Sequence, residues 1–126
     1  MTHVYVKALV KGPKGNREVP ELLVDTGAAF TVLPIDILRD VGAFLQPLKK
    51  KLELGDGRFV EAETYSVVLG IQDREDVTFV VTFKGAKPVL GVRSLEDLGF
   101  KVDPVAGSLE PTRPPGSAFY YYTRCC

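Results

Sequence analysis

Residues 22–33 of this chain read LLVDTGAAFTVL, in which a single aspartate, Asp25, stands between two apolar runs. Both runs have the composition and length of short β-strands. A carboxylate is costly to place at the end of a buried strand unless partners offset its desolvation. The glycine that follows, Gly27, lets the backbone turn tightly and lets amide groups approach the carboxylate. The residues alone allow two interpretations: an ordinary Asx-turn, or a carboxylate positioned for chemistry.

The segments around this stretch alternate between turn signals and runs of strand-forming residues. We expect strands over residues 3–10, 18–24, 30–33, 65–71, 77–83 and 100–102, a hairpin over 51–64, and a short closing segment at 108–109. Helices are expected only at residues 34–41, with Pro34 in the first helical position, and at residues 92–98. Gly42 and Gly99 would end them in the left-handed conformation. The sequence therefore predicts a mostly β fold with two short helices.

A change of composition near residue 111 indicates how the chain is organised. The 126 residues are enough for one modest core, and we assign a single domain to residues 1–110. Residues 111–126 are rich in proline and tyrosine and predict a C-terminal tail. Its aromatic run at 119–122 resembles a stacking platform for nucleic acid, but few basic residues surround it. A disordered tail or a strand between subunits is therefore the favoured interpretation.

Composition excludes several classes of function. The 16 basic and 16 acidic residues give a net charge of zero, which is not typical of nucleic-acid binders. No apolar run is long enough to span a bilayer and the N-terminus does not resemble a signal peptide, so we expect a cytoplasmic protein without a membrane partner. Cys125 and Cys126 form no metal or redox motif. With His3 as the single histidine, a hydrolase built from this sequence must use carboxylates, and we expect neither metal nor cofactor.

A run of three lysines, residues 49–51, precedes the predicted hairpin. It could attract acidic substrates, but a solvated charged run is the simpler interpretation.

Three features, in order and spacing, resemble the retropepsin-like aspartic proteases, the single-domain, homodimeric relatives of pepsin. The first is the stretch from Asp25 to Ala28, between apolar strands. The second is Val89-Leu90-Gly91, directly before the helix predicted at 92–98. The third is the glycine-containing hairpin tip at 54–58, which corresponds to the flap of the family. The resemblance covers residues 4–110 and implies the retropepsin-like single-lobe acid protease fold, in which the second-motif strand passes through the loop of the first.

The activity that this resemblance implies requires two carboxylates that share one proton. One carboxylate acts as general base on a water molecule while the other protonates the carbonyl of the peptide. This chain carries the motif once and is too short for two lobes, so Asp25 would meet Asp25 of a second copy across a twofold axis. The resemblance thus implies an aspartic endopeptidase that works as a homodimer on a peptide or protein substrate, without a cofactor.

The resemblance also assigns roles to individual residues. Asp25 would be catalytic, Thr26 would hydrogen-bond across the twofold axis, and Gly27 would present its carbonyl to the substrate backbone. The residues expected to bind substrate are Gly27, Ala28, Ala29, Val32, Gly55, Asp56, Gly57 and Val89.

Two departures from the family pattern bear on specificity. Viral members have an acidic residue at the position of Ala29 and an arginine at the position of Val92, so this chain is closer to the non-viral members. A non-catalytic dimeric module of the same fold, which binds peptides or acts as a scaffold, is the alternative function. The missing pair favours that alternative, whereas the intact Asp25 motif favours the enzyme, because a binding module needs no pair of buried carboxylates.

Overall fold

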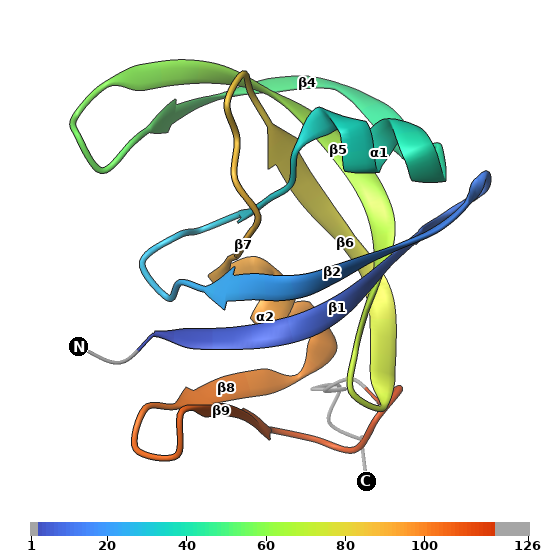
Figure 1. Cartoon of the computed structure of the whole chain (residues 1–126), viewed down its shortest axis with the longest axis vertical. Coiled ribbons are helices and arrows are strands. Elements are labelled where there is room, and N and C mark those ends of the chain that lie inside the picture. The colour runs from blue at the N-terminus through green and yellow to red at the C-terminus, as the bar shows by residue number, and fades with distance from the viewer. Residues whose placement is uncertain (1–2, 118–126) are drawn as a thin grey trace, which may run out of the picture.

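The computed structural model describes residues 3–117, which form nine strands and two short helices (Figure 1). The strands are β1 (Val4–Gly12), β2 (Gly15–Val24), β3 (Thr31–Val32), β4 (Phe44–Glu53), β5 (Phe59–Ile71), β6 (Arg74–Thr82), β7 (Val89–Leu90), β8 (Phe100–Asp103) and β9 (Ser108–Pro111). The helices are α1 (Ile35–Val41) and α2 (Val92–Leu98). The prediction of a mostly β fold with two short helices is confirmed. Within the described part of the chain, no helix is long and apolar enough to cross a membrane.

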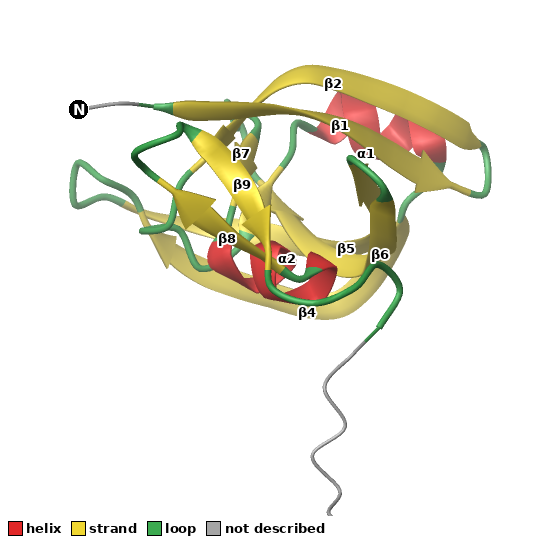
Figure 2. Ribbon diagram, turned by 90° about the horizontal axis from the view of Figure 1, so that it is seen from below, coloured by secondary structure: helices red, strands yellow, loops and turns green. Residues whose placement is uncertain are grey.

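Seven of the strands form one sheet in the order β1-β2-β7-β3-β6-β5-β4. The sheet closes on itself, because β1 also pairs with β5 where Leu9 lies opposite Gly70. β4 stays outside this closed ring and pairs only with β5, while β8 and β9 form a separate two-stranded sheet. Figure 2 shows α1 beside the β1–β2 hairpin and α2 close to β8. The ring provides a rigid frame from which the loops at one end project.

Aliphatic side chains fill the interior of this frame. The largest fully buried ones are Leu22, Leu33, Leu38, Leu69, Ile71 and Leu90. They come from β2, β5, β7 and α1, with Leu33 in the link between β3 and α1, so burial of their apolar surface holds the ring and the helix together.

Two register shifts interrupt the strand pairing, and each lies at a proline. Between Val6 and Ala8 of β1, the partners on β2 change from Leu22 to Val19, so β2 advances by three residues while β1 advances by two. Pro20 lies in that interval and has no N–H to offer the ladder. Similarly, β4 advances by four residues around Pro47, from Leu45 to Lys49, while its partner β5 advances by two. Both shifts are β-bulges, which bend a strand and redirect its side chains.

The predicted element boundaries need three corrections. Pro34 is not in the first helical position: its ψ of 148° is extended, so it caps α1, which begins at Ile35. The predicted strand at 65–71 is not separate from the hairpin, because β5 runs unbroken from Phe59 to Ile71. β4 already begins at Phe44. The glycine caps are confirmed, since Gly42 and Gly99 have φ values of 71° and 81°.

The packed structure continues beyond residue 110. Pro111 ends β9, and the guanidinium of Arg113 donates from Nη2 to the carbonyls of Glu96 and Asp97, both at 2.8 Å. The aromatic run at 119–122 and the two terminal cysteines lie outside the described residues.

Candidate active site

The loop that carries Asp25 encloses a strand from a distant part of the chain. β7 lies between β2 and β3, the two strands that flank this loop. It pairs in parallel with β2, where Val24 lies opposite Leu90, and antiparallel with β3, where Val32 lies opposite Val89. The N–H of Asp25 donates to the carbonyl of Leu90 at 3.0 Å. The position of Asp25 therefore depends on β7 as well as on its own strand.

Gly91 allows β7 and the loop to come this close. A Cβ atom built on Gly91 would lie 2.4 Å from the carbonyl carbon of Phe30, which is too short for any real contact. Directly after it, the N–H groups of Val92 and Arg93 donate to the carbonyls of Ala28 and Ala29 at 2.8 and 3.1 Å. The start of α2 thus fixes the loop on the side away from Asp25.

Three buried hydroxyl groups connect the loop to the helix and the sheet behind it. Thr31 Oγ1 accepts from the N–H of Gly91 at 3.0 Å and donates to Ser94 Oγ at 2.6 Å. Ser94 Oγ lies 2.8 Å from Thr78 Oγ1, which donates to Asp97 Oδ2 at 2.9 Å. Sequence reasoning missed this network, because its members come from β3, β6 and α2 and no local pattern relates them.

Asp25 forms the Asx-turn that the sequence allowed, and its carboxylate remains open to solvent. The N–H of Gly27 donates to Asp25 Oδ1 at 2.9 Å, and the N–H of Ala28 donates to the Asp25 carbonyl at 3.1 Å. Asp25, Thr26 and Gly27 are all exposed in the single chain. A turn and a reactive carboxylate are therefore compatible here.

The open side of the loop faces a cavity of about 740 Å³. Of the residues predicted to act at the site, Asp25, Gly27, Ala28, Ala29, Val32, Gly55 and Val89 line it. Thr26, Asp56 and Gly57 do not. Sequence reasoning missed further lining residues: Phe30, Leu52, Glu53, Leu54, Val81, Phe83, Gly85 and Lys87. Lys51, from the lysine run at 49–51, also lines the cavity. Strand alternation was the available signal for Leu52, near the end of β4, and for Leu54, two residues farther on and just past the end of that strand.

The tip of the β4–β5 hairpin forms one wall of this cavity. Its turn is closed by the N–H of Leu54, which donates to the Arg58 carbonyl at 2.8 Å, and Gly57 has a φ of 86°. The Asp56 carboxylate accepts from the N–H and the Nε of Arg58, at 3.0 and 2.7 Å. These two hydrogen bonds lower the pKa of Asp56 from its ordinary value. Asp56 therefore stabilises the turn and does not point its charge into the cavity.

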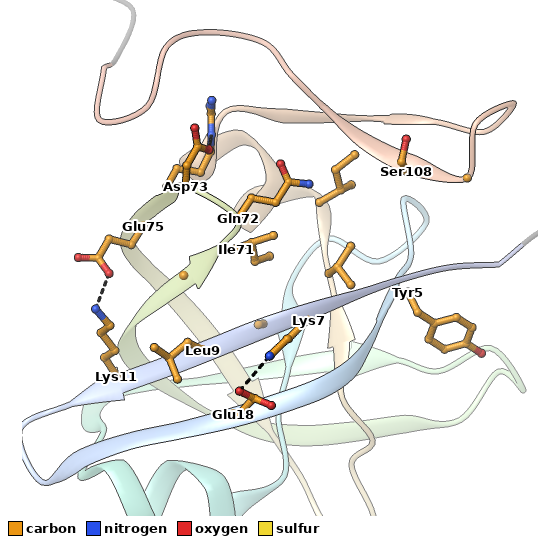
Figure 3. Close-up of a pocket in the computed structure, with 16 residues that line it drawn as sticks. Tyr5, Lys7, Leu9, Lys11, Glu18, Ile71, Gln72, Asp73, Glu75 and Ser108 are labelled. Atoms are coloured by element: carbon orange, nitrogen blue, oxygen red, sulfur yellow. Dashed lines mark hydrogen bonds and ion pairs between the residues drawn. The ribbon is translucent and has the colours of Figure 1, made fainter.

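A larger hollow of about 950 Å³ lies elsewhere, between β1, the β5–β6 turn and the start of β9 (Figure 3). Its charged side chains are neutralised in pairs: Lys7 with Glu18 at 3.4 Å and Lys11 with Glu75 at 2.7 Å. Asp25 is not among its lining residues. The smaller cavity is the candidate active site, because an exposed carboxylate on a rigid loop lies there.

Within residues 3–117, no three His, Cys, Asp or Glu side chains lie close enough together to hold a metal ion. Comparison with protein-family models gave no match, and comparison with curated protein sequences gave no significant match.

Proposed function

We propose that the chain is one subunit of a homodimeric retropepsin-like aspartic endopeptidase. The observation that carries this proposal is the placement of β7 between the two strands that flank Asp25. In that placement, hydrogen bonds to β7 and to the start of α2 hold the loop that carries the carboxylate. The placement also agrees with the family resemblance of the sequence. A rigid, exposed carboxylate beside a cavity is what a shared-proton dyad requires from each subunit.

The exposure of the Asp25 loop supports a dimer. A single carboxylate cannot act as general base and general acid on the same carbonyl at once. Asp25, Thr26 and Gly27 are exposed together, so a second copy can approach this loop along a twofold axis. In that arrangement the two Asp25 carboxylates would share one proton and activate a water molecule between them.

The cavity supports a peptide as the substrate. Its lining combines apolar side chains with the Asp25 loop on one side and a glycine-tipped hairpin on the other. An extended peptide would lie between loop and hairpin, with the Gly27 carbonyl available to its backbone. Closure of the hairpin over the peptide would then exclude bulk water.

The alternative is a non-catalytic dimeric module of the same fold that binds peptides or serves as a scaffold. One observation favours it: positions 29 and 92, alanine and valine here, contribute no charge to hold a peptide. Hydrolysis separates the two functions, because a binding module retains its ligand intact.

The test is cleavage of a peptide library at acid and neutral pH, with Asp25→Asn as the inactive variant. We expect the variant to lose about a thousand-fold or more in rate while it keeps its fold by circular dichroism. Asp36→Asn, which alters an exposed aspartate of α1, is the matched control and should retain activity. Activity should fall as rising pH ionises both members of the dyad. Equal cleavage by the two variants, or a rate that rises into alkaline pH, would contradict the proposal.

A further inference from the structure

A second cavity, of about 630 Å³, adjoins the Asp25 cavity, and Phe30 lines both. The bulge at Pro47 forms one wall of this second cavity, and α2 forms the opposite wall through Arg93. The interval of the register shift therefore contributes Gln46, Pro47 and Leu48 to a space that shares Phe30 with the Asp25 cavity.

Two cations lie against Phe30, one from each wall. Lys50 Nζ is 4.6 Å from the centre of the ring and the Arg93 guanidinium carbon is 4.9 Å from it. Contact with an aromatic ring holds a cation in place without cancelling its charge. Across residues 3–117, neither side chain has a carboxylate within 4.0 Å of its nitrogen atoms.

Because side chains alternate between the two faces of β4, Lys50 lies on the opposite face from Lys49 and Lys51. Lys49 pairs with Glu61 at 3.3 Å, and Lys51 lies over the Phe59 ring at 4.7 Å. Lys50 points to the other face of the strand, where its partner across the ladder is the fully buried Ala62. Within the lysine run, Lys49 is therefore a solvated residue, Lys51 lines the Asp25 cavity and Lys50 lines the second cavity.

A buried hydroxyl group adds an independent sign of a ligand. Thr64 is 2% exposed and lines the second cavity, and its Oγ1 has no hydrogen-bond partner within the described residues. A buried hydroxyl without a partner is costly, and a small movement of this side chain toward the cavity would let a carboxylate oxygen accept its proton.

Two acidic residues, Glu96 and Asp97, line the same cavity. They come from the last turn of α2, about one helical turn beyond Arg93. Asp97 is already engaged, since it accepts from Thr78 Oγ1 at 2.9 Å. Both cations thus lie at Phe30, the residue that the two cavities share, and the acidic groups come from the next turn of α2.

The geometry points to a subsite for an acidic side chain of the substrate, formed by Lys50, Arg93 and Thr64 around Phe30. This inference rests on the proposed peptidase function and adds a substrate class to it. A glutamate or aspartate a few residues from the scissile bond would pass Phe30 and place its carboxylate between the two cations. Charge-assisted hydrogen bonds of this kind are among the stronger ones in proteins.

The experiment is a positional library in which each position flanking the cleaved bond carries Glu, Gln or Lys. We expect kcat/KM at one position to be about ten-fold higher for Glu than for Gln. Lys50→Gln and Arg93→Gln should remove that preference while cleavage of the Gln peptide persists. Lys49→Gln is the matched control, because it removes the same charge one residue away on the opposite face, and it should keep the preference. The preference should also shrink at high salt.

The outcomes separate this inference from the proposed function. Two outcomes would overturn the subsite but not the peptidase proposal. One is cleavage of the Glu and Gln peptides at equal rates. The other is a preference for Lys, which Glu96 and Asp97 would bind. If no peptide is cleaved, the peptidase proposal fails. Binding of the Glu and Gln peptides to Asp25→Asn, followed by fluorescence anisotropy, then decides the subsite. Tighter binding of the Glu peptide supports it, and equal or absent binding overturns it.

Discussion

Gly91 is a residue at which the fold tolerates little change. Because a Cβ there would meet the backbone of Phe30 rather than a movable side chain, the loop and β7 would have to separate. We expect Gly91→Ala to lower the free energy of unfolding by about 3 kcal/mol, measured by urea denaturation. At Gly70, the nearest atom to an added Cβ is 3.7 Å away. Gly70→Ala should therefore change stability by less than about 1 kcal/mol. Similar losses in both variants would contradict the close approach at Gly91.

Arg74 is a buried charge that organises the end of α2. Its side chain is 3% exposed, and its Nη1 donates to the carbonyls of Leu98, Gly99 and Arg113 at 3.2, 3.1 and 2.8 Å. Leu98 and Gly99 are the last residue and the cap of α2, which has no basic residue in its last turn, and Arg113 belongs to the C-terminal segment. Arg74 therefore stabilises the helix end and joins it to the C-terminal segment.

Removing this guanidinium would take a donor from the carbonyls of Leu98 and Arg113, whereas the Gly99 carbonyl would keep its hydrogen bond from the N–H of Thr112. We expect Arg74→Met, which keeps much of the side-chain volume, to cost about 3 kcal/mol in thermal or chemical unfolding. Arg39→Met removes an equal charge from the exposed face of α1 and should cost less than about 0.5 kcal/mol. If Arg74→Met proved as stable as the natural chain, the hydrogen bonds at the end of α2 would be unimportant for stability.

The proposed closure of the β4–β5 hairpin over the peptide can be tested by a substitution at its tip. Gly57 at its tip has a positive φ and nothing within 4 Å of an added Cβ, so valine there would strain the turn without a clash. We expect Gly57→Val to reduce peptide turnover by about ten-fold, because a stiffened tip closes poorly over the peptide. Stability should fall by only about 1–2 kcal/mol.

The β8–β9 turn supplies the matched control for that change. Gly107 has a φ of 67° and equally open surroundings, but it does not line the Asp25 cavity. Gly107→Val should cost a similar amount of stability and leave turnover unchanged. Unaltered turnover in a folded Gly57→Val protein would reduce the hairpin to a plain structural element.

Assembly can be tested on the whole molecule by mixing two forms of the chain. In the proposed dimer, each active site takes one Asp25 from each subunit. An excess of Asp25→Asn subunits should therefore suppress the activity of the natural chain, because mixed dimers carry a single competent aspartate. Sedimentation should show dimers that dissociate on dilution as activity per subunit falls. Activity that is insensitive to both dilution and added variant would contradict a shared site.

Local signals in the sequence predicted the parts of the fold that local physics determines. The caps at Gly42 and Gly99 were found because a left-handed helix end favours glycine. The Asp25 turn was found because an aspartate and a glycine follow an aliphatic strand. Nothing in Val89 and Leu90 alone indicates a strand that pairs on both sides, and only the family resemblance suggested it. The Thr31–Ser94–Thr78 network and the contacts of Lys50 depend on pairings between distant segments, which a periodic pattern does not encode.

The enclosure of β7 by the Asp25 loop also has a consequence for biosynthesis. The aspartate is made early, but the strand and helix start that brace its loop are made near the end of the described chain. Until those late residues leave the ribosome, β2 and β3 have no strand between them and Asp25 has no fixed position. Contacts between such distant segments also form slowly. In the proposed protease, a nascent or prematurely terminated chain would thus carry Asp25 without a working site, and activity would begin only once the strand and helix start that hold its loop have been made.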